Sequence, residues 1–369
     1  MGSYRKYLVT LLVSVTPMLA GPIGFNTVLL ASDQPGVAAV TDPGLINPWG
    51  LSASGTSPFW LGINGSGTSE LYNGSGVKQG LVVTIPPVGT GTPTGTVFNG
   101  VAGAFNSDVF LFASEDGTIS GWRGALGTTA ETLIGANAAN VYKGLALGST
   151  GGGNYAYAAN FRTGTIDVVK GSAGDPNLTG TFIDPSLPAG YAPFDVQNIG
   201  GILYVTYAVQ DAAKHDDVAG AGNGIVDKFD LSGNFLGRLV TGGALNSPWG
   251  LAIAPAGFGD VAGDLLVGNF GDGRIDAYNA TTGAFVETLV DANGNPISID
   301  GLWALRFGNG SGSGPVNSLY FTAGPNGEAD GLFGDLVTAP EPGTWALFGM
   351  GLAGVVLAGR RGGLGRKSR

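Results

Sequence analysis

The sequence of 369 residues contains no cysteine, a single histidine and only 12% charged residues. Without cysteine the chain has no disulfide, no thiol nucleophile and no thiolate ligand for zinc or an iron–sulfur cluster. The one histidine, His215, excludes a histidine metal cluster; its polar surroundings indicate a solvated loop residue rather than a catalytic base. A formal net charge of −10 opposes nucleic-acid binding, which depends on clustered lysine and arginine.

The N-terminus has the pattern of a secretory signal peptide. Arg5 and Lys6 precede an apolar run over residues 7–15, and prolines soon after it oppose a longer helix. The sequence therefore predicts a signal peptide over residues 1–20 and export of the chain from residue 21 onward. A buried N-terminal helix is the alternative interpretation.

The C-terminus carries three elements in order. They are the tripeptide Pro340, Glu341 and Pro342, an apolar run over 345–358, and a basic tail that begins with Arg360 and Arg361. Fourteen apolar residues form a helix of about 21 Å, and the flanking arginines reach the headgroups, so a transmembrane helix is predicted. The basic tail places residues before Pro340 outside the cytoplasm, the same orientation that a signal peptide requires.

This three-part arrangement resembles the PEP-CTERM sorting signal of Gram-negative bacteria. The resemblance covers residues 339–369 and implies recognition and cleavage by an exosortase-type enzyme. It also implies an inner-membrane anchor before processing, a location in the envelope, at the outer surface or in the medium afterwards, and association with exopolysaccharide matrix or envelope proteins. Between the two ends, residues 21–339 carry 10 Lys and Arg against 26 Asp and Glu, a net charge of −16. The exported body is acidic and is expected to favour cations.

The middle of the chain repeats with a period near 50 residues. The sequence Pro-Trp-Gly-Leu occurs at 48–51 and again at 248–251. A second marker, a glycine that opens a short alternating segment, recurs at spacings of 47 to 60 residues, at Gly67, Gly117, Gly164, Gly224, Gly273 and Gly327. Units of about this length are typical of propeller blades rather than helical solenoids.

Each unit is expected to form four short strands separated by turn residues. In the fifth unit these are residues 248–254, 264–269, 274–278 and 284–290, whereas the sixth offers only 302–307, 318–322 and 331–333. Residues 25–31 resemble an outer strand and are predicted to complete the sixth unit, which closes the ring. The predicted fold is an all-β, six-bladed β-propeller over residues 21–338.

Glycine, with 68 occurrences, is expected in tight turns and in crowded inner strands. Trp49, Trp249 and Trp303 recur at matching inner-strand positions and are expected to pack between blades. The segments 47–51, 59–72 and 247–251 resemble an uncharacterised family of exported bacterial proteins that often carry PEP-CTERM tails, and Asn47-Pro48-Trp49-Gly50 is the sharpest motif of that resemblance. That resemblance implies a six-bladed propeller and no established activity.

Propellers bind ligands at the mouth of the central channel, in loops that share one face. The channel candidates in such loops are Asn47, Asn64, Lys143, Asn246 and Asn269. Candidate oxygen ligands for Ca²⁺, a hard cation, are Glu115, Asn160, Asp195 and Asp300. The alternative is that these residues cap turns, which is the commoner role of Asn and Asp.

Two functional classes remain open. The first is a non-catalytic exported protein that binds matrix polysaccharide, partner proteins or cations. The second is a Ca²⁺-dependent hydrolase or lyase of the lactonase-like propeller type, which resembles this chain in fold only. We expect a binding protein rather than an enzyme, with no catalytic residue assigned.

Overall fold

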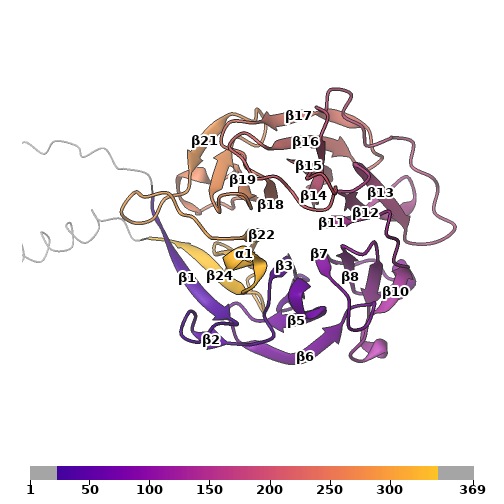
Figure 1. Cartoon of the computed structure of the whole chain (residues 1–369), viewed down its shortest axis with the longest axis horizontal. Helices are drawn as coiled ribbons and strands as arrows, with labels where there is room; N and C mark the ends of the chain where they lie inside the picture. The colour runs from indigo at the N-terminus through magenta and orange to yellow at the C-terminus, as the bar shows by residue number, and fades with distance from the viewer. Residues whose placement is uncertain (1–22, 340–369) are drawn as a thin grey trace, which may run out of the picture.

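Six sheets surround a central axis in the computed structural model, which describes residues 23–339 (Figure 1). The innermost strand of each sheet contacts the innermost strand of the next, and β22 (Leu302–Phe307) contacts β3 (Pro48–Ser52), so the ring is closed. The predicted six-bladed propeller is confirmed. The predicted signal peptide at 1–20 and apolar helix at 345–358 lie outside the described residues. Between residues 23 and 339, no helix combines the length and apolarity needed to cross a membrane.

The first three blades follow one another along the chain, each with its innermost strand first. Blade 1 contains β3, β4 (Phe59–Ile63), β5 (Thr68–Tyr72) and β6 (Lys78–Thr84). Blade 2 contains β7 (Pro93–Phe98), β8 (Phe110–Ser114), β9 (Ile119–Trp122) and β10 (Glu131–Ile134). Blade 3 contains β11 (Tyr142–Thr150), β12 (Gly153–Asn160) and β13 (Thr165–Lys170).

The remaining blades continue this order. Blade 4 contains β14 (Tyr191–Ile199), β15 (Ile202–Val209), β16 (Ile225–Asp230) and β17 (Phe235–Thr241). Blade 5 contains β18 (Pro248–Ile253), β19 (Leu265–Asn269), β20 (Ile275–Tyr278) and β21 (Phe285–Thr288). Blade 6 contains β22, β23 (Leu319–Ala323) and β24 (Leu332–Thr338), followed by β1 (Phe25–Ser32) and β2 (Val40–Thr41). Short helical turns occur in the loops, at η1 (Asn64–Ser66), η2 (Phe105–Ser107), η3 (Gly124–Leu126), η4 (Gly259–Val261) and α1 (Pro325–Glu328).

The N-terminal strand fastens the last blade to the start of the chain. Strand β1 runs antiparallel to β24, with Val28 opposite Asp335, so the predicted closure is confirmed. Phe25 is buried at the start of β1, and its ring centroid lies 4.7 Å from that of Phe258 in blade 5. Closure therefore combines backbone pairing within blade 6 with apolar packing between blades 5 and 6.

Two units depart from the four-strand expectation. Blade 3 has three strands, because residues 171–190 turn away and bond to the β16–β17 turn of blade 4, where Phe182 packs between Tyr157 and Phe229. In blade 6 the third strand begins at Leu332, and the expected marker Gly327 instead lies in the turn α1. Strand β2, which pairs in parallel with β1, is an additional strand.

All six inner strands have a one-residue irregularity of pairing at the same place, which is typical of a β-bulge. In five blades a small residue accompanies the bulge, at Gly50, Gly95, Gly144, Gly250 and Ala304. A Cβ at Gly95 would lie 2.5 Å from the Leu145 nitrogen, and one at Gly250 would lie 2.5 Å from the Trp303 carbonyl oxygen. Glycine is used here because neighbouring inner strands approach too closely for a side chain.

The third strands of four blades carry an acid at an equivalent position. Asp276 in blade 5 is satisfied, since it accepts hydrogen bonds from Thr288 Oγ1 at 2.5 Å and Asn269 Nδ2 at 2.8 Å. Asp227 in blade 4 is fully buried, and neither oxygen has a hydrogen-bond partner, although Arg238 Nε lies 3.4 Å away. Burial, reinforced by the charge of Asp184, raises the pKa of Asp227 to about 7.

Phe25→Ala is expected to destabilise the propeller by about 3–5 kcal/mol, because it removes a buried ring from the closure. Val28→Ala, on the same strand but 41% exposed, is the matched control and should cost under about 1 kcal/mol. Chemical denaturation of both variants measures the difference. Equal stability of the two variants would show that β1 contributes little to closure.

Asp227→Asn is expected to stabilise the protein at pH 8 by about 1–3 kcal/mol, since a buried carboxylate without hydrogen bonds is removed. The folded state binds this proton more tightly than the unfolded state, so the contribution of Asp227 to stability falls as the pH rises from about 4 through 7. The stabilisation by Asp227→Asn should therefore be smaller at pH 5 than at pH 8. The control is Asp276→Asn, which removes a carboxylate that has hydrogen-bond partners and is expected to destabilise the protein. Urea unfolding of both variants at pH 5 and pH 8 measures these differences.

Candidate functional site

The six bulges place one side chain per blade at the axis, and these six residues are called the axial ring. They are Trp49, Thr94, Lys143, Phe194, Trp249 and Trp303, and each is at most 3% exposed. Side chains from blades that are not neighbours touch. The rings of Trp49 and Trp249 lie 6.4 Å apart, and Lys143 Nζ lies 4.9 Å from the Trp49 ring centroid. Trp49 and Trp303 stack at 3.6 Å, so the channel is closed at this level.

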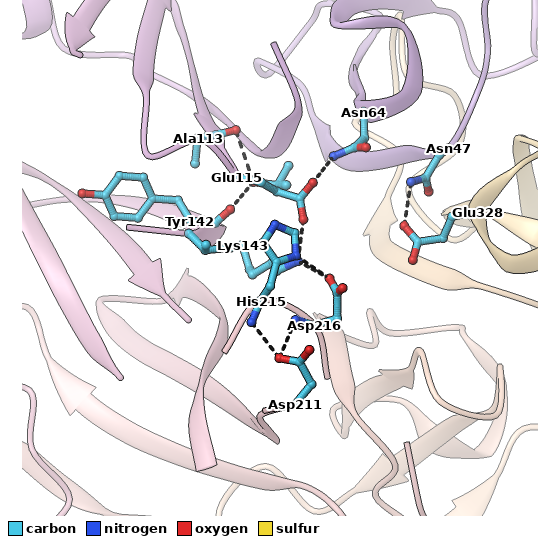
Figure 2. A network of polar contacts seen from close by, with 12 residues as sticks. Asn47, Asn64, Ala113, Glu115, Tyr142, Lys143, Asp211, His215, Asp216 and Glu328 are labelled. Carbon is cyan, nitrogen blue, oxygen red and sulfur yellow. Dashed lines mark hydrogen bonds and ion pairs between the residues drawn. The ribbon is translucent and has the colours of Figure 1, made fainter. Parts of the chain in front are cut away.

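Lys143 is the charged member of the axial ring, and it organises a polar network at one mouth of the channel (Figure 2). Its Nζ lies 2.5 Å from Glu115 Oε1 and 3.4 Å from Asp216 Oδ1. Asn64 Nδ2 donates to the other oxygen of Glu115 at 3.0 Å, and His215 Nδ1 lies 2.8 Å from Asp216 Oδ1. We call these five residues the lysine cluster; they come from blades 1 to 4.

Blade 6 contributes Glu328 and Trp303 to the same mouth, and both contact Asn47, which lies just before β3 of blade 1. Asn47 Nδ2 donates to Glu328 Oε2 at 2.7 Å, and Asn47 Oδ1 accepts from the Trp303 indole N–H at 3.0 Å. Both Asn47 and Glu328 have positive φ, at 49° and 69°, a conformation that non-glycine residues rarely adopt. Their polar contacts hold this strained backbone against the axial ring.

The electrostatics keep Lys143 protonated. Burial alone would lower its pKa, but the charges of Glu115 and Asp216 outweigh burial and raise the pKa above its usual value. Burial also raises the pKa of Glu328, which lies at the same mouth. Lys143 is therefore the ion-pair partner of Glu115 and Asp216.

The four calcium candidates do not come together. Glu115 belongs to the lysine cluster, whereas Asn160 donates to Asp167 Oδ2 and Asn140 Oδ1 within blade 3. Asp195 accepts from Gln197 Nε2, and Asp300 accepts from the Asn326 backbone N–H. Among the described residues, one acidic group with metal-like spacing includes Glu115, with His215 and Asp216, whose ligand atoms lie within 4.8 Å of one another. The Lys143 ammonium already forms ion pairs with both carboxylates of this group.

The channel candidates divide into two kinds. Asn47, Asn64 and Lys143 lie at the channel mouth, in the contacts given for the lysine cluster and blade 6. Asn246 and Asn269 stabilise blade 5: Asn246 accepts from the Gly220 N–H at 2.7 Å, and Asn269 accepts from the Asn246 N–H at 2.9 Å and donates to Asp276. Asn160 in blade 3 corresponds to Asn269, so both are turn-stabilising residues.

A pocket of about 530 Å³ occupies the channel on the other side of the axial ring. All six inner strands line it with residues that follow the bulge, and Trp249 reaches it from the ring. Its polar and charged lining residues are Ser52, Thr96, Asp195, Gln197, Asn198 and Arg306. Asp195 is 2% exposed, and burial raises its pKa well above the usual value. Arg306 Nη2 donates to the Ala53 carbonyl at 3.1 Å.

Sequence reasoning named four members of the axial ring, the three tryptophans and Lys143, and missed Thr94 and Phe194. The missing signal is a degenerate form of Pro-Trp-Gly-Leu, namely Pro93-Thr-Gly-Thr, Tyr142-Lys-Gly-Leu, Pro193-Phe-Asp-Val and Leu302-Trp-Ala-Leu. The ring positions are 45 to 55 residues apart, so the repeat near 50 residues could have located all six of them in the sequence. Arg306, one strand position beyond the bulge, carries no such signal.

A PEP-CTERM protein-sorting motif matches residues 338–361, which indicates exosortase-type sorting, export and an envelope or surface location. Over most of the chain, two uncharacterized proteins of Acanthamoeba polyphaga mimivirus are similar. One is 32% identical over 326 residues, 83% of this chain and 78% of the relative; the other is 30% identical and covers 84% of each. The chain belongs to the family of these viral proteins. The expected bacterial family therefore stays a prediction.

Solved structures share the fold at low identity. An α-L-arabinanase of Penicillium chrysogenum, complexed with arabinobiose, matches with a TM-score of 0.52 and 12% identity, over 85% of this chain and 97% of that one. A glucose dehydrogenase matches with a TM-score of 0.51 and 13% identity, over 85% and 100%. At this identity the likeness extends to the propeller fold alone.

Lys143→Met is expected to destabilise the protein by about 3–5 kcal/mol, because Glu115 and Asp216 lose their shared cation. Lys228→Met, at a half-buried position that makes no ion pair in the described chain, is the matched control and should change stability by less than about 0.5 kcal/mol. Denaturant unfolding at pH 7 measures both. A Lys143→Met protein as stable as the wild type would refute the structural role of the lysine cluster.

Proposed function

We propose that this protein is an exported binding protein that holds a small hydroxylated ligand, such as a sugar unit, in its axial pocket. The supporting observation is the pocket itself, which is closed by the axial ring at one end and has a volume suited to such ligands. Its lining combines aromatic rings, including Trp249, with amide, carboxyl and guanidinium groups. Aromatic faces and planar polar groups together suit a ring that carries hydroxyls.

The chemistry of the pocket favours binding over catalysis. Its lining contains one carboxyl group, Asp195, and no histidine, lysine or glutamate. Glycoside hydrolysis in its usual form needs two carboxyl groups, and a calcium site needs several oxygen ligands around one point. The acidic group at the opposite mouth is already paired with Lys143, which weighs against the alternative of a Ca²⁺-dependent hydrolase or lyase.

The location of the protein extends this proposal. A PEP-CTERM motif directly after β24 supports delivery of a folded propeller to the envelope, with the anchor processed by the sorting enzyme. In a Gram-negative cell, the propeller would then lie where matrix polysaccharide or envelope proteins are its available partners. Its acidic surface would keep it soluble and apart from nucleic acid.

The test is saturable binding of monosaccharides to the purified protein, measured by tryptophan fluorescence and by calorimetry. The probes are glucose, galactose, N-acetylglucosamine, glucuronate and galacturonate. At least one is expected to bind and to change the emission, because Trp249 lines the pocket. Ala252→Phe, which narrows the pocket, should weaken binding about tenfold or more, while Ala284→Phe on the exposed surface should not.

Two results would contradict the proposal. The first is that none of the five sugars binds, or that Ala252→Phe binds as the wild type does while remaining folded. The second is hydrolase or lyase activity that depends on millimolar calcium, together with a chelator-reversible rise in melting temperature. The second result would favour the enzyme instead.

A further inference from the structure

We infer that Arg306 makes the axial pocket selective for ligands that carry a carboxylate beside hydroxyl groups, of which uronic acids are representative. This inference rests on the proposed function, because it assigns the ligand class of the same pocket. It is carried by the position, pairing and hydrogen-bonding capacity of one guanidinium group.

Arg306 is exceptional among its structural equivalents. The third residue after the axial-ring residue occupies the same position in every blade, and the six are Ser52, Val97, Ala146, Gln197, Ala252 and Arg306. All six line the pocket, and Arg306 alone is charged. The fold itself therefore does not require a cation at this position, since five blades form the same bulge without one.

The pairing of Arg306 is incomplete. In the described part of the chain it takes part in no ion pair, although acids outnumber bases there by 26 to 10. Lys78, Arg123, Lys143 and Arg238 each have at least one carboxylate partner. Six of the ten lysines and arginines between residues 23 and 339 make no ion pair, and Arg306 is the one of these six that lines the pocket.

The one hydrogen bond of Arg306 orients the group without using it up. Nη2 donates to the Ala53 carbonyl of blade 1, which holds the side chain at the junction of blades 6 and 1. A guanidinium has five N–H donors in a planar fork, so four remain for a ligand. Two parallel donors match the two oxygens of a carboxylate, a geometry that a lysine would not supply.

The rest of the pocket supplies complementary contacts. Asp195 and Gln197 lie on β14 and are hydrogen-bonded to each other at 3.1 Å, which fixes an acceptor and an amide against the wall. Such groups bind hydroxyls.

The experiment compares matched sugars that differ in one group: galacturonate with galactose, and glucuronate with glucose. Calorimetry on the wild-type protein is expected to show that each acid binds about 10- to 100-fold more tightly than its neutral partner. Arg306→Gln should reduce that ratio to near one. Arg306→Lys, which keeps the charge but not the fork, should retain only part of the preference.

Arg274→Gln is the matched control, because Arg274 is exposed and makes no ion pair in the described chain. It should bind all four sugars as the wild type does. Melting temperatures of the variants establish that each is folded, so a purely structural role of Arg306 would appear as lost stability with an unchanged acid preference.

Each contrary outcome has a distinct meaning. Equal binding of acid and neutral sugar by the wild type, or an acid preference that survives in Arg306→Gln, overturns the assignment to Arg306 and leaves the proposed function standing. Tighter binding of inorganic phosphate than of galacturonate would contradict the carboxylate class. If no sugar binds at all, the proposed function itself fails.

Discussion

The propeller depends on the close approach of six inner strands around one axis. Adjacent inner strands meet at positions where the backbone of one blade lies where a Cβ of the next would be, so glycine occupies four of these positions and alanine a fifth. The same step in each strand is a one-residue bulge, which turns a side chain from the blade interface towards the axis. Close approach and redirected side chains are therefore two consequences of one constraint.

The identity of the redirected side chains decides what the channel is. Three tryptophans and a phenylalanine give the axis an apolar core, and Lys143 contacts Trp49 from within the same ring. A buried ammonium requires carboxylates, and these come from loops of blades 2 and 4. The lysine cluster joins blades that share no strand pairing, which gives the channel mouth a structural role.

The two ends of the channel consequently differ in chemistry. At the mouth with the lysine cluster, the ammonium of Lys143 is paired with carboxylates of the protein itself. At the other end, the pocket retains a guanidinium without a carboxylate partner, together with the aromatic side chains of Phe98, Trp249 and Phe307. Family membership and shared fold do not distinguish these ends, because the viral relatives are uncharacterized and the solved propellers are related by architecture alone.

Much of the architecture followed from local patterns. The period near 50 residues, the alternation within each unit and the spare segment at 25–31 were sufficient for six blades and for closure by β1, because both depend on local propensity and on counting strands. The number of strands in a single blade was harder to predict. Blade 3 has a loop in place of a fourth strand, and this loop bonds to blade 4. Its Phe182 packs between Tyr157 and Phe229, a tertiary contact that local strand patterns do not show.

The candidate functional site was likewise predictable only in part from the sequence. Asn47, Asn64, Glu115 and Lys143 could be chosen from loop positions, since the loops that precede inner strands and those that follow second strands reach the same face. Which groups pair was decided only by tertiary structure: Asp195 lies beyond the axial ring, Asn160 bonds within its own blade, and Glu115, a candidate calcium ligand, pairs with Lys143. The physical reason is that strand periodicity is encoded locally, whereas distances across the axis depend on the bulges and the closed ring, which join residues hundreds of positions apart.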